Sequence, residues 1–440
     1  MSSKHMKHVL TWLRLSHQSV AILLAAMIGI FSAFGAGLIR IGVPWARENF
    51  IQSTSSFMKT ELILFLFPLF GALATYIFRK MIDKELRDGQ GIAEVMVSVQ
   101  EGRGRIPSKD LFINTMGSMI SLIAGLPVGS VGPTIFLTAG LGSLFSTFTH
   151  VSPMKARTYL SCGAAAGISA LFNAPIGGMI FALEMILGEY RSGYFSLIIV
   201  SSFSASLTSR WLFGNVPVFT VPPYTMYSMW EILFYALLGI LGAFLGLFHS
   251  HVFHNFQKYW RFTHLPQKLI LFVSALFVSF FGLLTPLIYG GGFPAIEKAL
   301  MGQLSLTLML SLLFLQLIGN SMVLSAGFFG GIFAPILFTG AMLGGSFGMM
   351  MQLFFPTIVS QPGAYALVGM GAALAATGRA PMTAIVLLFE MTNDYRMILP
   401  LMITTVISFS LRDVFDEYSI FTMKLRHHSK YKWVAVRKYH

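Results

Sequence analysis

The sequence predicts an all-α protein that crosses a membrane many times and is built from two copies of one unit. Its composition supports the membrane part of this prediction. Of its 440 residues, 55% are hydrophobic and 11% are charged, whereas roughly 25% of the residues in an ordinary soluble domain are charged. The mean hydropathy is +0.72, so a soluble core would lack the polar residues needed for its outer shell. Composition therefore excludes a soluble globular protein, a disordered chain and a coiled coil.

Apolar segments along the chain mark the predicted membrane elements. They cover residues 20–43, 62–78, 111–126, 134–148, 158–187, 194–214, 229–252, 267–289, 303–322, 332–354, 364–390 and 397–411. Several are shorter than the roughly 20 residues that cross a bilayer. The chain is also interrupted by prolines at positions 127, 133, 175, 335 and 381. Half-length and interrupted helices are typical of transporters and channels whose site lies at mid-membrane.

Basic residues in short loops predict the orientation. They gather before residue 20, in the loop 79–110 and after residue 420, whereas the segment 44–61 holds only Arg47 and Lys59. Because basic loops stay in the cytoplasm, we expect both termini there. Residues 1–425 form the predicted membrane domain. Residues 426–440 form a basic cytoplasmic tail, which we expect to contact anionic lipid headgroups and to carry no soluble domain.

Other function classes find little support. The net charge of +13 fits this topology better than nucleic-acid binding, and Cys162, the single cysteine, allows no intrachain disulfide. The chain has neither a His-Glu-x-x-His zinc motif nor a Gly-Lys phosphate-binding loop. A polytopic membrane enzyme remains a distant alternative, and we expect no catalytic residue, cofactor or metal site.

The chain also repeats itself. Three pairs of segments match in the same order: 163–175 with 369–381, 132–140 with 334–342, and 89–93 with 290–294. Close helix packing explains small residues in any one match, but it does not explain the shared order. The sequence therefore predicts repeat one at about 60–215 and repeat two at about 265–420, with a solute site where they meet.

Polar residues at matched repeat positions have two readings. Glu184 and Glu390 each lie nine residues after a motif proline. They could carry protons, but their symmetry favours a scaffold role in which each satisfies nearby backbone groups or pairs with a cation. Asn173 and Arg379 also match, and we expect them to cap or brace helices.

Three glycine-rich breaks lead into apolar segments and predict the site. They read GQGIA at 89–93, GSVGP at 129–133 and GGIFAP at 330–335. Each presents unpaired backbone N–H groups at a helix start, where the helix dipole favours an anion. Pro133 and Pro335 fit early helix positions, which need no N–H group. Several weak dipoles release an anion more readily than a full cation would.

These stretches resemble the signature motifs of the CLC family of chloride channels and chloride/proton antiporters. The family patterns are G-S-G-I-P, G-[KR]-E-G-P and G-x-F-x-P, followed by a late tyrosine that Tyr418 resembles. The resemblance implies a homodimer of multi-pass subunits in the bacterial inner membrane. Each subunit would consist of two inverted repeats of tilted, partly re-entrant helices.

The resemblance also implies the site residues. Chloride would be held by the N–H groups of Ile332 and Phe333, by the Tyr418 hydroxyl, and by the Gln90 side chain beside Gly91. Gln90 stands where the family serine favours chloride. An amide still offers a donor, so chloride remains the first choice and another small anion the alternative.

Two departures from the family decide the expected mechanism. The family's gate carries a glutamate where this chain has Val131 followed by Gly132, and the antiporters' second proton-relay glutamate is replaced by Met185. Neither side chain titrates, and proton coupling needs a titratable group. The sequence therefore predicts a passive chloride channel or uniporter. The alternative is an anion/proton antiporter that uses a different carboxylate, such as Glu184.

Overall fold

The computed structural model describes residues 17–55, 59–82, 91–100, 104–190, 192–215, 217–219, 221–224, 226–416 and 418–422. These residues are almost entirely helical, and their one β-type pairing is an isolated bridge. The elements of the first half are α2 (His17–Ser55), α3 (Thr60–Met81), α4 (Ile92–Gln100), α5 (Ser108–Ile123), α6 (Val131–Phe148), α7 (Pro153–Phe172), α8 (Pro175–Phe181), the π-helix η1 (Ala182–Leu187) and α9 (Ser192–Phe213).

The second half begins with a long helix and continues as a similar series. Its elements are α10 (Glu231–Phe262), α11 (Gln267–Leu284), η2 (Pro286–Ile288), α12 (Phe293–Leu300), α13 (Leu306–Ala326), α14 (Phe333–Phe354), α15 (Pro362–Gly378), α16 (Pro381–Thr392), η3 (Tyr395–Met397) and α17 (Ile398–Phe415). Among the described residues, 8 helical segments are long and apolar enough to cross a membrane. The predicted all-α membrane architecture is confirmed.

The first helix is longer than the sequence analysis predicted. We expected the apolar run to end near residue 43, but α2 continues through Pro44 to Ser55. Proline removes one backbone hydrogen bond but does not oblige the chain to turn, and Ala46, Arg47 and Glu48 favour helix. The polar end of α2 is therefore helical.

Two predicted apolar segments are each split in the middle. Residues 158–187 divide into α7, α8 and η1, and residues 364–390 divide into α15 and α16. At the splits, Asn173 and Arg379 adopt left-handed conformations, with φ of 53° and 58°, and end the preceding helix. A left-handed residue is a common helix C-cap, so the capping role predicted for both residues is confirmed.

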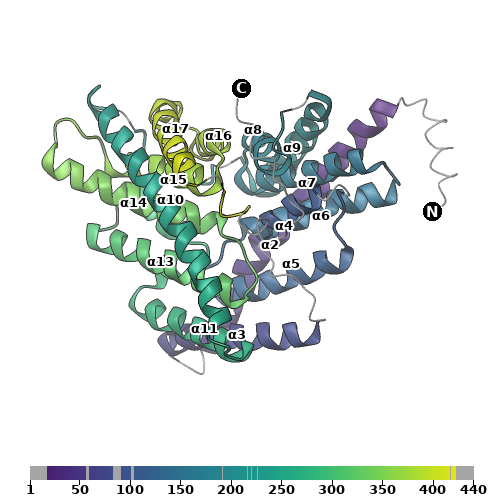
Figure 1. Cartoon of the computed structure of the whole chain (residues 1–440), viewed down its shortest axis with the longest axis horizontal. Helices are drawn as coiled ribbons and strands as arrows, with labels where there is room; N and C mark the ends of the chain where they lie inside the picture. Colours follow the sequence, from purple (N-terminus) through teal and green to yellow (C-terminus); the bar gives the residue numbers. More distant parts are fainter. Residues whose placement is uncertain are drawn as a thin grey trace.

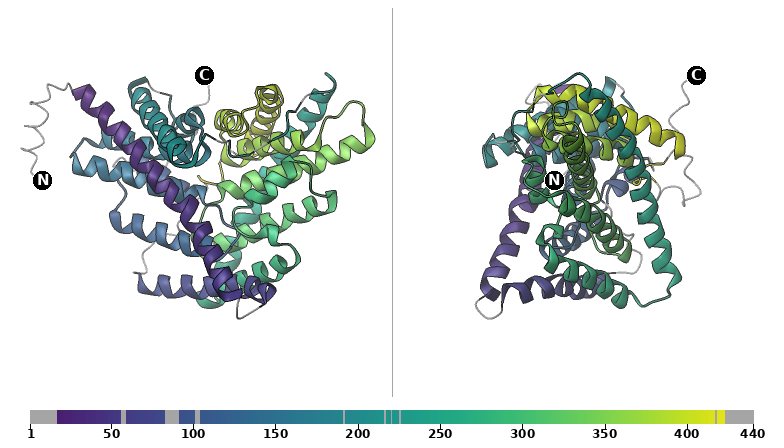
Figure 2. Two further views of the ribbon diagram at one scale, coloured as in Figure 1. Left: turned by 180° about the vertical axis from the view of Figure 1, so that it is seen from behind. Right: turned by 90° about the vertical axis from the view of Figure 1, so that its left-hand side faces the viewer.

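Figure 1 shows the two repeats as two halves of the molecule, with helices α4–α9 on one side and α12–α17 on the other. The short helices α8 and α16 pack against each other where the halves meet. The long helix α2 runs diagonally across the molecule (Figure 2). This arrangement brings helix ends from both halves toward the middle.

Glycines allow equivalent helix pairs to pack closely in both halves. A Cβ on Gly142 of α6 would overlap the Tyr159 carbonyl of α7, and a Cβ on Gly344 of α14 would overlap the Tyr365 carbonyl of α15. The same backbone approach is thus built twice, which agrees with a duplicated unit.

Candidate functional site

The start of α4 lies directly against the start of α6. Gly91, just before α4, has φ +63°, and a Cβ built on it would overlap the carbonyl group of Gly132. Only glycine combines this conformation with so close an approach. The first two glycine-rich motifs therefore meet through their backbones.

The second and third motifs are joined by a pair of backbone hydrogen bonds. The Gly129 N–H donates to the Gly331 carbonyl at 2.7 Å, and the Gly331 N–H donates to the Gly129 carbonyl at 2.9 Å. This bridge holds the segments before α6 and α14 in antiparallel register. Three helix starts, far apart in sequence, are thus brought to one place.

The first backbone N–H groups of α6 and α14 are the polar groups where these helix starts meet. Val131 and Phe333 are completely buried, and Gly132 and Ile332 are also buried. Within the described chain, the backbone N–H groups of these four residues donate to no protein acceptor, and neither helix has a side-chain cap. Buried N–H groups need a partner, and at a helix start they favour an anion.

The position predicted to form the gate carries no charge. Val131 is the first residue of α6, and its exposed fraction is 0%. Gln90, predicted to bind the anion, lies outside the described residues, although its neighbour Gly91 lies inside them.

Phenylalanine side chains surround the start of α14. The Phe333 ring lies 6.4 Å from the Phe172 ring and 6.2 Å, edge-on, from the Phe181 ring, measured between centroids. Phe172 ends α7 and Phe181 ends α8, so these contacts join three helix ends. The start of α14 is therefore bordered by apolar rings on this side.

Met185 lies one helical turn beyond Phe181, in the π-helix η1, and is 5% exposed. A Cβ on Gly378 would lie 3.6 Å from the Met185 Cε and 3.7 Å from the Phe421 ring. The predicted lost relay position is thus packed against the end of α15 and close to the segment that follows Tyr418. Its surroundings are apolar.

Glu184 caps a helix in the opposite repeat. Its carboxylate accepts hydrogen bonds from the Met382 N–H at 3.1 Å, the Thr383 N–H at 2.7 Å and the Thr383 hydroxyl at 2.6 Å. These groups open α16. These contacts satisfy donors at the open start of α16, as the scaffold reading of Glu184 predicts.

Glu390 makes the reciprocal contact. Its carboxylate accepts from the Ile176 N–H at 3.1 Å and the Gly177 N–H at 2.6 Å, which open α8. Each repeat therefore supplies the N-terminal cap for the other repeat's short helix.

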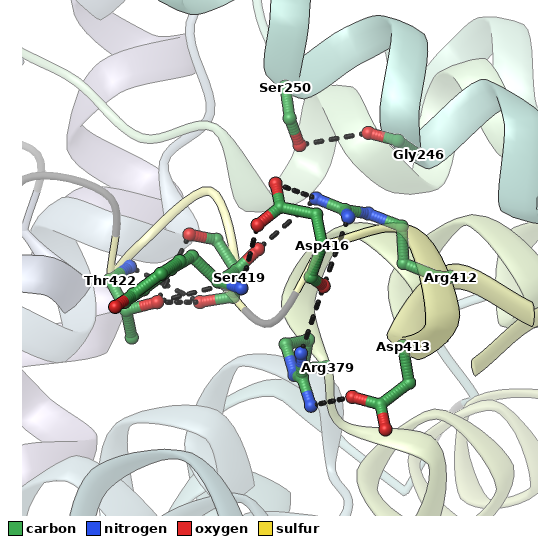
Figure 3. Close-up of polar contacts among 9 residues, drawn as sticks. Gly246, Ser250, Arg379, Arg412, Asp413, Asp416, Ser419 and Thr422 are labelled. Atoms are coloured by element: carbon green, nitrogen blue, oxygen red, sulfur yellow. Dashed lines mark hydrogen bonds and ion pairs between the residues drawn. The ribbon is translucent and has the colours of Figure 1, made fainter. Parts of the chain in front are cut away.

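Tyr418 is held by its backbone. Its N–H donates to Asp416 Oδ1 at 3.1 Å, and its carbonyl accepts from Arg412 Nη2 at 3.1 Å. Figure 3 shows Asp416 between the guanidinium groups of Arg379 and Arg412. These contacts place Tyr418 just beyond α17, and the anion-binding role of its hydroxyl stays a prediction.

One carboxylate near the helix starts was missed by the sequence analysis. Glu94 lies in the first turn of α4, three residues after Gly91, and is partly buried. A signal was available, because an acidic residue early in a helix is favoured by the helix dipole. Across the part of the chain that the structure covers, no cluster of His, Cys, Asp and Glu could hold a metal ion.

Comparison with known proteins identifies a family. The family model described as voltage gated chloride channel matches residues 70–413. The chain is 31% identical to the H(+)/Cl(-) exchange transporter ClcA of Salmonella paratyphi B over 395 residues, which cover 87% of this chain and 83% of that protein. It is also 31% identical to a ClcB-like protein of Ralstonia nicotianae over 321 residues, covering 72% and 75%.

Solved structures share the fold. A slow cyanobacterial Cl-/H+ antiporter superposes with a TM-score of 0.80 at 23% identity, covering 94% of this chain and 97% of its own. A fluoride/proton antiporter of CLC type superposes with a TM-score of 0.77 at 20% identity, covering 92% and 98%. The fold class predicted from the sequence is confirmed.

Proposed function

Because this chain belongs to the CLC family of anion transporters, we propose that it conducts chloride, or a similar small anion, passively and without exchange for protons. The anion would bind at the buried amides of Val131, Gly132, Ile332 and Phe333. Gln90, Gly91 and the Tyr418 hydroxyl complete the proposed site. The relatives named as exchangers carry out a coupled reaction, so the proposal is that this chain has lost the coupling.

The observation that carries the proposal is the apolar character of the gate. Val131 is fully buried at the start of α6, where a carboxylate would compete with the anion and exchange protons. Beyond the enclosing phenylalanines, Met185 is also buried and apolar. A proton cannot pass through such a region without a titratable group or water.

The test is anion efflux from proteoliposomes with simultaneous recording of external pH. With valinomycin and a potassium gradient setting the voltage, chloride should leave steadily without proton movement. A chloride gradient should likewise fail to drive protons uphill. Uphill proton movement that stops when the protein is omitted would contradict the passive mechanism.

The second candidate is proton-coupled exchange through another carboxylate. Glu94 favours it, because this residue lies in the first turn of α4 beside the contact between Gly91 and Gly132. Glu184 favours it less, because its carboxylate already accepts three hydrogen bonds. If protons do move, Glu94→Gln should abolish their movement, whereas Glu184→Gln should leave it.

We further propose a homodimer in the bacterial inner membrane, with both termini in the cytoplasm. The helices α8 and α16 lie together at one edge of the molecule (Figure 1), and Ile176 and Met382 in their first turns are 51% and 49% exposed. Lipid cannot satisfy the polar groups of a helix start, and a carboxylate facing lipid is costly. A second copy placed against this edge would shield Glu184 and Glu390 from lipid.

A further inference from the structure

The segment after α17 is fastened by a buried arginine, and we propose that Arg412 is a positioning residue that sets the place of Tyr418 in the anion pathway. This inference rests on the proposed function, since it takes the Tyr418 hydroxyl as an anion ligand. Arg412 acts through Tyr418 and does not itself contact the anion.

A single guanidinium reaches three acceptors. Arg412 is completely buried in the last turn of α17. Its Nη1 donates to the Asp416 carbonyl at 3.2 Å, and its Nη2 donates to Asp416 Oδ2 at 3.0 Å and to the Tyr418 carbonyl at 3.1 Å. The planar guanidinium suits this set of acceptors, whereas the single ammonium of lysine does not reproduce its geometry.

Asp416 completes the clamp on Tyr418. The Asp416 Oδ1 accepts from the Tyr418 N–H at 3.1 Å, so both backbone polar groups of Tyr418 are held by the Arg412–Asp416 pair. Arg379 adds a donor to the Asp416 carbonyl at 3.1 Å (Figure 3). The Ile420 N–H donates to the Thr377 carbonyl at 3.1 Å and ties the segment to α15. Because hydrogen bonds hold the Tyr418 backbone on both sides, its side-chain torsions determine where the hydroxyl lies.

The charges in this cluster indicate that Arg412 acts by positioning Tyr418 and not by attracting the anion with its charge. Arg412 pairs with Asp416, and Arg379 pairs with Asp413. The positive and negative charges therefore balance, and the cluster adds no net charge that would attract an anion. Burying a guanidinium, as at Arg412, is costly even when it is paired, and a helix can end without one. The cost is consistent with a need to hold the following residue in a defined place.

The other repeat offers a matched control. Arg210 lies near the end of α9, at the position equivalent to Arg412, and its Nε donates to Asn173 Oδ1 at 2.8 Å. It braces the end of α7 and, among the residues that the structure describes, holds no tyrosine segment. Arg210→Lys therefore makes the same chemical change at an equivalent helix end, at an exposed arginine where Arg412 is buried.

The experiment is a double-mutant cycle on chloride affinity, measured by calorimetry on the purified full-length protein. Tyr418→Phe removes the hydroxyl, and loss of a hydrogen bond to a charged group should weaken affinity about tenfold. Arg412→Lys should weaken it by a similar factor. The double variant should be no weaker than Tyr418→Phe alone, because residues that act as a unit are not additive. Arg210→Lys should leave chloride affinity unchanged.

Each contrary result has a distinct meaning. Unchanged affinity in Arg412→Lys, or an equal loss with and without the Tyr418 hydroxyl, overturns the positioning role and leaves the proposed anion site intact. Unchanged affinity in Tyr418→Phe removes Tyr418 from the proposed site, and the positioning role falls with it. If Arg412→Lys fails to fold, Asp416→Asn takes its place in the cycle. That variant keeps an acceptor for the Tyr418 N–H and should give a smaller, equally non-additive loss.

Discussion

The proposed anion site consists chiefly of backbone N–H groups, so a single side chain would act mainly through the charge that it adds to the site or leaves out. The amides of Val131, Gly132, Ile332 and Phe333 are offered by the helix starts whatever the side chains are. In this proposal, Val131 leaves uncharged the point where a carboxylate would compete with the anion. Its replacement is therefore the most informative single change.

Val131→Glu should slow chloride flux and make it pH-dependent. The ionised carboxylate would occupy the amides, and protonation would release them, so flux should fall as pH rises through the carboxyl pKa. With an ordinary glutamate pKa near 4.3, flux at pH 7.5 should be at least about tenfold below flux at pH 4.5. The measurement is initial efflux from proteoliposomes across this range.

Val131→Gln is the control for the size of the new side chain. It should slow flux to a similar degree at every pH, because an amide does not titrate. If Val131→Glu gives the same flux at every pH, the pathway does not pass the start of α6.

The sequence predicted that the two positions at which the family carries proton-handling glutamates are uncharged here. It did not predict every carboxylate near the proposed site. Val131 and Met185 followed from their motif positions, and the structure places both among buried apolar groups. Glu94 was missed because its place near the helix starts depends on the approach of Gly91, just before α4, to Gly132 in α6. The positions of these residues along the sequence do not show that the two segments pack together.

At the scale of elements, the two short helices depend on each other's repeat. Glu184 closes the start of α16 and Glu390 closes the start of α8. Neither helix crosses a bilayer by itself, so its open N–H groups need a protein partner within the membrane.

Glu184→Ala should lower stability by about 2 kcal/mol, because three donors at the start of α16 lose their acceptor. Glu390→Ala should have an effect of similar size. The measurement is thermal unfolding in detergent, followed by circular dichroism. Glu61→Ala, at an exposed first-turn glutamate of α3, is the control and should shift the midpoint far less. An unchanged midpoint in both cap variants would contradict the assigned role.

The sequence predicted most of these elements but not their partners. Proline and glycine positions predicted the splits after Asn173 and Arg379, and the spacing of Glu184 and Glu390 indicated a shared scaffold role. The exchange of caps between repeats was not predictable, because it depends on contacts between residues about 200 positions apart. The extension of α2 to Ser55 was missed because its polar end carries no apolar signal.

At the scale of the whole molecule, equivalent features recur on both sides of the site. Gly125 and Gly327 have φ of +71° and +100° and precede the paired residues Gly129 and Gly331 by the same number of positions. Each lies beside an arginine, Arg47 in one case and Arg79 in the other. Both guanidinium groups also lie over aromatic rings, at 5.5 and 5.0 Å. The duplication predicted from three short matches thus extends to contacts that the sequence did not reveal.

The proposed dimer predicts a particle of about twice 48.5 kDa when light scattering is corrected for detergent. Ile176→Trp, at the edge formed by α8 and α16, should shift the population toward monomer. Phe280→Trp, at a similarly exposed position on α11, should not. A monomer in the unchanged protein would contradict the assembly but not the pathway within each chain.

The central claim is that helix starts from both repeats hold an anion at a gate without a carboxylate. The most direct measurement is anomalous scattering from crystals soaked in bromide. We predict a peak within hydrogen-bonding distance of the amides of Val131, Gly132, Ile332 and Phe333, and a weaker peak in Val131→Glu crystals grown at neutral pH. Bromide peaks found only elsewhere, with none at these amides, would contradict the account.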